Sequence, residues 1–293
     1  MLPTMPSRRK PKIAILGAGN LGNALAVSLR SAGYVVSEIV ARGTRPSVRK
    51  ARTLARKVGA HATVVGQPQI TADVVWFCVP DREVAHAARS LADQVSWKGR
   101  VALHSSGALA SDALTALRRR GANLASAHPL MTFVPGEVPS LAGVSFAVEG
   151  DNAAVRIVKA IISALGGDSF PIEKRDKAAY HAWGTFASPL LTSLLAATER
   201  VARAAHVGHD EARRRVLPLA QQTLENYARR GAALGFSGPI VRGDAETVRQ
   251  HLKILRKVPE AAEVYRALAR AALRNLPAKN RAELEKVLKD RKS

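Results

Sequence analysis

The chain has 293 residues, of which 47% are apolar and 4% aromatic, and its 45 Lys and Arg against 23 Asp and Glu give a net charge of +22. This length predicts one large or two ordinary domains, and the apolar fraction is ample for a packed core, which excludes a disordered or collagen-like chain. The single cysteine, Cys78, excludes an internal disulfide framework and a zinc site made of several thiolates. We therefore expect an intracellular protein of the cytoplasm.

The apolar runs are too short for a membrane span. The strongest of them, Val74 to Val79, has the length of a strand, whereas a spanning helix needs roughly 18 to 20 apolar residues. The basic residues in Ser7 to Lys12 are followed by a short β-like run that ends at Gly17, without an apolar signal core or a cleavage site. The sequence predicts neither membrane insertion nor export.

The positive charge is spread along the chain. Basic residues recur in separate segments, at Arg42 to Arg56, Arg118 to Arg120, Arg213 to Arg215, Arg229 to Arg230 and Lys279 to Lys292. A nucleic-acid binder would gather such residues into one stripe with interleaved aromatic side chains. We therefore expect a solvated, arginine-rich surface and no nucleic-acid partner, with a polyanion-binding face as the alternative.

The first half of the chain alternates short β-rich runs with helical patterns. The predicted strands are Ile13 to Leu16, Val35 to Ala41, Thr63 to Val65, Val74 to Val79, Val101 to His104, Leu124 to Ala127 and Val144 to Val148. The predicted helices are Leu21 to Ser31, Val48 to Val58, Glu83 to Ala92, Leu109 to Arg119 and Ala153 to Leu165. Strict alternation implies right-handed crossovers and a parallel sheet covered on both faces.

The second half is predicted to be helical. From Lys174 onward Ala, Leu, Arg and Glu dominate, and helical patterns cover Ala178 to Ala205, Glu211 to Arg230, Ala245 to Leu255 and Glu260 to Leu273. Pro189 interrupts the first of them and is expected to kink it or to end a segment. We therefore divide the chain into a basic tail at residues 1–10, an α/β domain at 11–170 and an all-α domain at 171–293.

A glycine-rich turn follows the first predicted strand. Gly17, Gly19 and Gly22, with Asn20 and Leu21 between them, match the dinucleotide fingerprint. The three glycines would permit the tight turn, the approach of backbone N–H groups to a pyrophosphate, and close packing of helix on strand, while the helix N-terminus favours the phosphates. The position in a βαβ unit favours cofactor binding over a merely structural turn.

The end of the second strand favours NADP over NAD. An NAD site usually has an acid there, whereas this chain has Arg42, Thr44 and Arg45 and no acid. Guanidinium groups and a hydroxyl suit a 2′-phosphate, which would repel a carboxylate. The alternative is that Arg42 merely belongs to the basic surface.

Several further motifs occur in a recognisable order. They are Val79-Pro80-Asp81, His104-Ser105-Ser106-Gly107, His128-Pro129-Leu130, Lys177-Ala-Ala-Tyr180-His181 and Gly238-Pro239-Ile240 with Arg242-Gly243-Asp244. With the glycine-rich turn they span most of the chain. In these motifs the chain resembles the Rossmann-like and DUF2520 domain-containing proteins, relatives of pyrroline-5-carboxylate reductase and of the β-hydroxyacid dehydrogenases.

The resemblance implies a Rossmann-like NADP-binding domain followed by an all-α C-terminal domain of the 6-phosphogluconate dehydrogenase type. It also implies that the helical domain builds a homodimer, and that an active site lies in the cleft between the two domains. It does not name a substrate.

Two of the motifs are expected at the carboxyl edge of the sheet, where open α/β sheets bind ligands. Val79 and Pro80 are placed to contact the cofactor, and Asp81 is expected to be the N-cap of the next helix. Ser105 and Ser106 correspond to a turn that holds the substrate carboxylate in β-hydroxyacid dehydrogenases, and otherwise they satisfy a structural turn.

Three residues are candidates for proton transfer. His128 follows a predicted strand, and an imidazole titrates near neutral pH, although a structural histidine is an equal alternative. Lys177 and His181 are four residues apart and share one face of a predicted helix. The resemblance implies that Lys177 is the general acid, and the alternative is a surface lysine paired with Glu173. His181 stands where the dehydrogenases have an asparagine.

The second half of the chain holds one further candidate for substrate binding and, after His181, a second difference from the family. Arg242 is predicted to grip a substrate carboxylate in a shaped loop, and Asp244 to be the N-cap of the next helix. Pro189 stands where the family is expected to have an asparagine.

These features together predict an NADPH-dependent oxidoreductase that acts on a small carboxylate-bearing carbonyl, hydroxyacid or imine. The alternatives are a non-catalytic NADP-binding regulatory protein, for which His181 and Pro189 would mark a lost site, and a polyanion-binding protein on a Rossmann scaffold. The histidines and acids show no metal-like grouping, so no metal is predicted.

Overall fold

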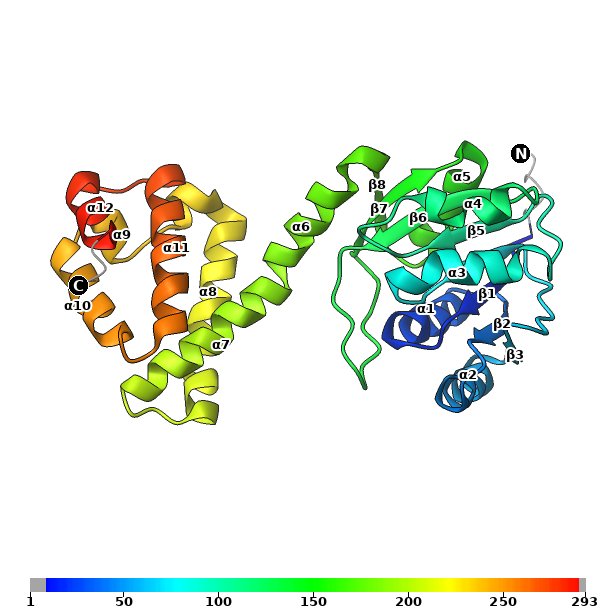
Figure 1. Cartoon of the computed structure of the whole chain (residues 1–293), viewed down its shortest axis with the longest axis horizontal. Helices are drawn as coiled ribbons and strands as arrows, with labels where there is room; N and C mark the ends of the chain where they lie inside the picture. Colours follow the sequence, from blue (N-terminus) through cyan, green and yellow to red (C-terminus); the bar gives the residue numbers. More distant parts are fainter. Residues whose placement is uncertain (1–8, 290–293) are drawn as a thin grey trace, which may run out of the picture. The chain divides into compact units, whose positions relative to one another are not determined.

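The structure is a computed structural model and describes residues 9–289. The predicted basic tail, residues 1–10, therefore lies almost wholly outside the described residues. The chain divides into two compact units, one ending at Thr185 and the other beginning at Phe186 (Figure 1).

The N-terminal unit is built on one sheet of eight strands. They are β1 (Ile13–Leu16), β2 (Val36–Ala41), β3 (His61–Val64), β4 (Val74–Phe77), β5 (Val101–His104), β6 (Asn123–Pro129), β7 (Ser145–Gly150) and β8 (Asp168–Pro171). Their order in the sheet is β3-β2-β1-β4-β5-β6-β7-β8. All neighbours are parallel except β6 and β7, which are antiparallel.

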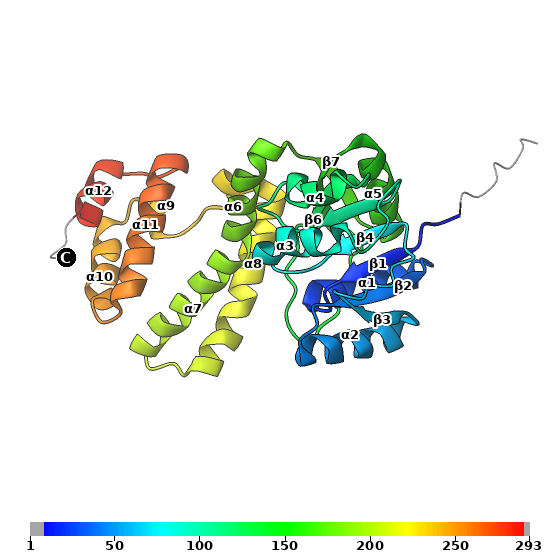
Figure 2. The ribbon, with the colours of Figure 1, turned by 45° about the vertical axis from the view of Figure 1, so that its right-hand side comes forward.

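Helices cover both faces of this sheet. They are α1 (Asn20–Ser31), α2 (Arg45–Val58), α3 (Asp81–Ala92), α4 (Thr115–Arg118) and α5 (Asn152–Ala164), with 3-10 turns η1 (Ser111–Leu114) and η2 (Lys174–Asp176). Side chains of α1, α2 and α5 share one apolar core with the strands, and those of α3 and α4 share the other. Along β1 the residues alternate between the two cores, as the pleat of a strand requires. Figure 2 shows α2 lying along β2 and β3.

The predicted Rossmann-like α/β class is confirmed, with two local differences. Residues 109–119 were predicted as one helix, but they form η1 and the short helix α4, because the N–H and hydroxyl of Ser111 are held by the buried carboxylate of Glu149. Strand β8 was not predicted, because this short edge strand is only partly buried and has no apolar alternation.

Helix α6 (Lys177–Ala187) begins in the N-terminal unit, where Lys177 and Tyr180 are buried. It ends at Ala187, and α7 starts at Pro189 after the non-helical Ser188. Proline suits the first turn of a helix and not its interior, so the predicted break at Pro189 is confirmed.

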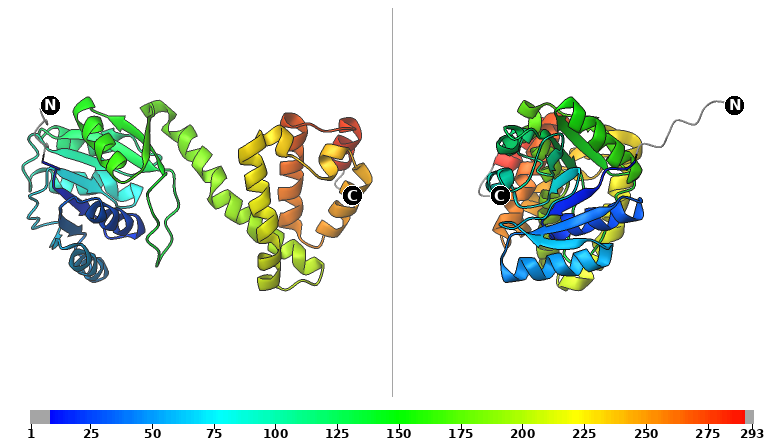
Figure 3. Two further views of the ribbon diagram at one scale, coloured as in Figure 1. Left: turned by 180° about the vertical axis from the view of Figure 1, so that it is seen from behind. Right: turned by 90° about the vertical axis from the view of Figure 1, so that its right-hand side faces the viewer.

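The C-terminal unit is all helical, as predicted. It contains α7 (Pro189–Ala204), α8 (His209–Gly235), α9 (Pro239–Arg242), α10 (Ala245–Leu255), α11 (Pro259–Asn275) and α12 (Arg281–Lys289). Its buried core lies among α10, α11 and α12 and includes Val248, Leu252, Leu273 and Leu284. These three helices, orange to red in Figure 3, lie together in both views. Among residues 9–289 no helix is long and apolar enough to cross a membrane.

Candidate functional site

The glycine-rich turn joins β1 to α1 and has the geometry of a phosphate cradle. Gly17 has a φ of +107°, and a Cβ there would lie 2.5 Å from the carbonyl oxygen of Cys78. A Cβ on Gly22 would lie 1.9 Å from the carbonyl oxygen of Gly17, so α1 can approach the turn only because this residue is glycine. A Cβ on Gly19, in contrast, would meet no atom within 4 Å. The missing side chain of Gly19 thus leaves open space beside the helix N-terminus.

This N-terminus of α1 has no side-chain cap, and Gly19 is its N-cap residue. The first N–H groups of a helix lack intrahelical partners and attract anions. The side-chain amide of Asn20 does not cap them and donates to the carbonyl oxygen of Phe133 at 3.1 Å. The residues of this turn therefore fit the diphosphate of a dinucleotide.

A basic cavity adjoins the turn. Its volume is about 520 Å³, and Gly19 and Asn20 line it together with Arg49, Lys50 and Lys57 of α2. No described acidic residue forms an ion pair with these three cations. The sequence analysis did not select them. The absence of any acid from α2 is the signal that could have indicated them.

The residues after β2 make few contacts with other side chains of the described chain. Arg42 lies 4.0 Å from a carboxylate oxygen of Glu83, a distance at the limit of an ion pair. The hydroxyl of Thr44 accepts the backbone N–H of Ser47 at 3.4 Å as the N-cap of α2, and Arg45 is the first residue of that helix. Arg42 and Arg45 are exposed and remain available to an anion.

Val79, Pro80 and Asp81 connect β4 to α3. Asp81 was predicted as the N-cap, and this is wrong: Pro80 is the cap and Asp81 is the first helical residue. The carboxylate of Asp81 instead accepts the hydroxyl of Ser106 at 2.8 Å, which ties this connection to the next one along the sheet. The preceding Cys78 is a free thiol whose pKa is raised by burial, as expected of a structural cysteine.

The residues after β5 form a tightly hydrogen-bonded turn. The hydroxyl of Ser106 also accepts the N–H groups of Ala108 and Leu109, at 3.2 and 2.9 Å. The hydroxyl of Ser105 accepts the indole N–H of Trp76 at 2.8 Å. Both hydroxyls thus shape the turn, and their predicted contact with substrate stays a prediction.

His104, the last residue of β5, forms hydrogen bonds within the same turn. It is fully buried, its Nδ1 accepts the N–H of Ser106 at 3.1 Å, and its Nε2 lies 3.0 Å from the carbonyl oxygen of Ala110. Burial lowers its pKa to about 4, and the nearby Lys177 adds to this, so the imidazole is neutral at neutral pH. A neutral imidazole with both nitrogens engaged acts as a structural brace.

Lys177 lies at the start of α6 and reaches under the turn. Its ammonium donates to the carbonyl oxygen of Ser106 at 2.9 Å and to the hydroxyl of Ser126 at 2.6 Å, and the residue is 1% exposed. It is therefore not a surface lysine paired with Glu173. Burial lowers its pKa to about 8, opposed by the charges of Glu149 and Asp81, and this value suits a proton donor near neutral pH.

His128 lies at the end of β6, with Tyr180 and His181 of α6 beside it. Its Nδ1 is 2.7 Å from the Tyr180 hydroxyl, and its ring meets that of His181 edge-on at 6.3 Å. A Cβ on Gly107 would lie 2.7 Å from His181 Cδ2 and 3.0 Å from His128 Nε2. The two imidazoles therefore occupy the space that a side chain at Gly107 would fill. The structure brings the candidate residues Lys177, His128, His181, Ser105 and Ser106 together in one unit.

Arg242 and Asp244 lie in the helical unit. Asp244 is the N-cap residue of α10, as predicted, and its carboxylate pairs with the Arg242 guanidinium at 2.9 Å. The expected loop around Arg242 is instead the short helix α9. Its role toward a substrate stays a prediction.

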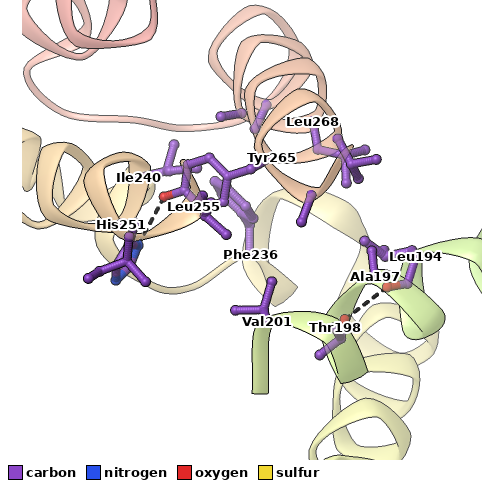
Figure 4. Close-up of a pocket in the computed structure, with 15 residues that line it drawn as sticks. Leu194, Ala197, Thr198, Val201, Phe236, Ile240, His251, Leu255, Tyr265 and Leu268 are labelled. Carbon is purple, nitrogen blue, oxygen red and sulfur yellow. Dashed lines mark hydrogen bonds between the residues drawn. The ribbon is translucent and has the colours of Figure 1, made fainter. Parts of the chain in front are cut away.

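The helical unit also contains an apolar pocket that the sequence did not reveal. Its volume is about 510 Å³, and Figure 4 shows Leu194, Val201, Phe236 and Leu268 around it. Its main polar feature is a hydrogen bond of 3.1 Å between His251 Nδ1 and the Tyr265 hydroxyl. Within residues 9–289, no group of three or more His, Cys, Asp or Glu side chains is placed to hold a metal ion.

An open α/β sheet with this glycine-rich turn defines a Rossmann-like domain. Residues 4–129 match the family model of the Rossmann-like domain, and residues 144–272 match that of DUF2520, a domain of unknown function. The chain therefore belongs to the Rossmann-like and DUF2520 domain-containing proteins, and the resemblance noted in its motifs is confirmed. A comparison with curated protein sequences found no match.

Solved structures share the fold along nearly the whole chain. A candidate NADP oxidoreductase from Bacteroides fragilis is 21% identical, with a TM-score of 0.74 over 89% of this chain and 97% of that one. A reductive aminase from Aspergillus terreus, solved with NADPH and ethyl-5-oxohexanoate, is 17% identical, with a TM-score of 0.65 over 95% and 99%. A pyrroline-5-carboxylate reductase from Coxiella burnetii is 15% identical, with a TM-score of 0.60 over 95% and 98%. At these identities the similarity shows the fold.

Proposed function

We propose that the protein is a cytoplasmic NADP-dependent oxidoreductase that reduces a small carboxylate-bearing carbonyl or imine, or oxidises the corresponding hydroxyacid. One observation carries the proposal: the same unit holds a phosphate cradle with an adjoining basic cavity and, at the ends of β5 and β6, a cluster of Lys177, His128 and His181. The reductive aminase of the same fold was solved with NADPH, which supports the choice of cofactor.

The cofactor would supply the hydride, and this chain's residues would bind and orient it. The N–H groups at Gly19 and Asn20 would face the diphosphate, and Val79 and Pro80 would contact the cofactor at the edge of β4. Arg42, Arg45 and Arg49 would face the 2′-phosphate, since guanidinium groups bind phosphate through paired hydrogen bonds.

The proton required at the substrate would come from the polar cluster. Lys177, with its pKa near 8, exists in both protonation states close to neutral pH, as a group that gives up and regains a proton requires. Ser105 and Ser106 would orient the substrate carboxylate. The positive charge of protonated Lys177 suits an anionic substrate.

The first experiment is a fluorescence titration of the purified protein with NADPH and with NADH at moderate salt. We expect tighter binding of NADPH, and loss of that preference in Arg42→Asp, because an added carboxylate repels the 2′-phosphate. An Arg89→Asp variant, on α3 at the other face of the sheet, is the matched control for the change in net charge. Absence of binding for both nucleotides would remove the redox function.

Homodimerisation through the helical unit is part of the proposal. Large apolar side chains on α8 are exposed, among them Leu219 at 67% and Leu234 at 77%. Contiguous patches of such side chains are typical of interaction surfaces, and Leu217, Leu224 and Tyr227 of the same helix are also exposed. Light scattering is expected to give the mass of a dimer, and Leu219→Glu with Leu234→Glu is expected to shift it toward the monomer. A monomeric wild-type protein would remove this part of the proposal.

One observation favours a second function, the binding of a polyanion. Arg45, Arg49, Arg52 and Arg56 of α2 line a hollow of about 320 Å³, and no described acidic residue pairs with them. Such binding would weaken steeply with salt, because each phosphate contact releases a counterion. If a fluorescent single-stranded RNA fails to bind at about 50 mM salt, where such contacts are strong, this function is removed.

A further inference from the structure

Tyr180 is a residue of the polar cluster to which the sequence analysis gave no role. It is 6% exposed, and its ring meets that of His128 edge-on, with the centroids 5.4 Å apart. Its hydroxyl oxygen lies 2.7 Å from Nδ1 of His128 and 3.4 Å from the carbonyl oxygen of the same residue. One phenol thus contacts one histidine at two points.

The two distances show which contact of the phenol is the stronger hydrogen bond. A hydroxyl has a single proton to donate, and 2.7 Å is an ordinary length for a hydrogen bond of this kind, whereas 3.4 Å is too long for a strong one. The strong hydrogen bond of the phenol therefore joins its hydroxyl to Nδ1, and the tautomer of His128 decides which of the two groups donates. A neutral imidazole that accepts at Nδ1 carries its own proton on Nε2.

We propose that Tyr180 is a positioning residue that holds His128 as the neutral tautomer with its proton on Nε2, so that this N–H donates a hydrogen bond to the substrate carbonyl or imine. The hydrogen bond to the substrate rests on the proposed function. The tautomer depends only on the hydrogen bond between Tyr180 and His128.

The surroundings of Nε2 agree with such a donor. No described residue forms a hydrogen bond with this nitrogen, which lies beside Gly107, where there is no side chain to block it. The titratable groups that face the His128 ring are Lys177, His181, Asp81 and His104. Burial lowers the pKa of His128 to about 4, and the positive charge of Lys177 lowers it further, so the ring is neutral at neutral pH.

The roles in the cluster then differ. A neutral imidazole stabilises negative charge on a substrate oxygen by hydrogen bonding, without becoming the source of the proton. The proton itself would come from Lys177 or His181. Proton transfer by His128, as expected from the sequence, stays a prediction, and a hydrogen bond from Nε2 is the more specific role proposed here.

The test uses the full-length protein with 15N-labelled histidine. Two-bond 15N–1H spectra distinguish the two neutral tautomers, and the His128 signals are identified by their loss in His128→Gln. In the wild type at pH 7 we expect the pattern of a proton on Nε2. In Tyr180→Phe we expect loss of this fixed tautomer and a rise in the pKa of His128, because the hydrogen bond that favours the neutral ring is gone.

The chain offers a matched control. His251 and Tyr265 form a similar pair in the helical unit, with Nδ1 and the hydroxyl 3.1 Å apart. Tyr265→Phe is expected to change the signals of His251 and to leave those of His128 unchanged. A wild-type His128 with its proton on Nδ1, or a Tyr180→Phe variant with unchanged His128 titration, would overturn the inference. The wild-type measurement decides even if the variant does not fold.

An NADPH titration separates this inference from the proposed function. Tyr180→Phe is expected to bind NADPH as the wild type does, because Tyr180 is not among the residues of the glycine-rich turn or the basic cavity. If the wild type binds no NADPH, the proposed function fails while the tautomer result stands. If it binds NADPH and His128 carries its proton on Nδ1, this inference alone fails.

Discussion

The ammonium of Lys177 donates to the carbonyl oxygen of Ser106, 71 residues earlier in the chain. This hydrogen bond joins the first turn of α6 to the loop that follows β5. The same group donates to the hydroxyl of Ser126 in β6. One charged side chain thus joins three elements that also carry the other candidate residues. Its protonation is therefore linked to the stability of the site.

Replacing Lys177 with methionine is expected to change how stability depends on pH. The folded-state pKa of about 8 lies below the ordinary lysine value of 10.5, so the folded state holds this proton less tightly than the unfolded one. The charged lysine therefore lowers the free energy of unfolding. This loss is present in full below about pH 8 and disappears as pH rises toward 10.5. In urea unfolding, the free energy of unfolding of the wild type should rise across this pH range by on the order of 3 kcal/mol relative to that of Lys177→Met. Parallel pH profiles would contradict the assignment.

Gly107→Ala is expected to destabilise the protein by about 1 to 3 kcal/mol, because the new methyl would overlap two imidazoles. The nearest atom is His181 Cδ2 at 2.7 Å, so removing that ring in Gly107→Ala/His181→Ala should recover part of the loss. Denaturant unfolding of the two single variants and the double variant measures the coupling. Strictly additive losses would show that His181 does not fill this space.

Gly19→Ala and Gly22→Ala are expected to differ in kind. A methyl on Gly22 overlaps the carbonyl oxygen of Gly17, and we expect a loss of about 3 kcal/mol or more. A methyl on Gly19 meets no protein atom within 4 Å, and we expect a loss of about 1 kcal/mol or less, as for an N-cap substitution. Binding of NADPH to Gly19→Ala should nevertheless fall more than about tenfold, because the methyl stands where the diphosphate approaches. Equal effects of both variants on stability and binding would be inconsistent with the cradle.

Arg49→Ala is expected to weaken NADPH binding by about tenfold and to leave NADH binding nearly unchanged, since a charge-assisted hydrogen bond to the 2′-phosphate contributes about 1.5 to 3 kcal/mol. Arg89→Ala, which removes an exposed arginine from α3, is the control. Isothermal titration calorimetry with both nucleotides gives the two affinities. A parallel loss for NADPH and NADH would assign Arg49 to the shared diphosphate.

Much of the fold was predictable because its signals are local. The alternation of β1, α1 and β2 is readable from apolar periodicity, and the glycine-rich turn from its spacing. The carboxyl-edge positions of Ser106 and His128 follow from the strand that precedes each. These inferences need only short stretches of sequence and the rule that parallel strands end at one edge.

The rest depends on contacts between distant segments. The burial of Lys177 requires Ser126, 51 residues away, and the role of Tyr180 requires His128, 52 residues away. Asp81 looked like a helix cap, but its partner is Ser106. Such pairings are set by the packing of α6 on the sheet, which no local pattern encodes.

The position of Lys177 in the chain has a consequence for biosynthesis. Strands β1 to β6 can pair as soon as they have been made, but Ser106 and Ser126 receive their cationic donor only after residue 177 has followed. Contacts of such long sequence separation slow folding, because the intervening chain must lose entropy before they form. A nascent chain that ends before α6 therefore has the sheet but lacks Lys177, Tyr180 and His181. The ribosome makes the segments that carry the partners of Lys177 before it makes Lys177 itself.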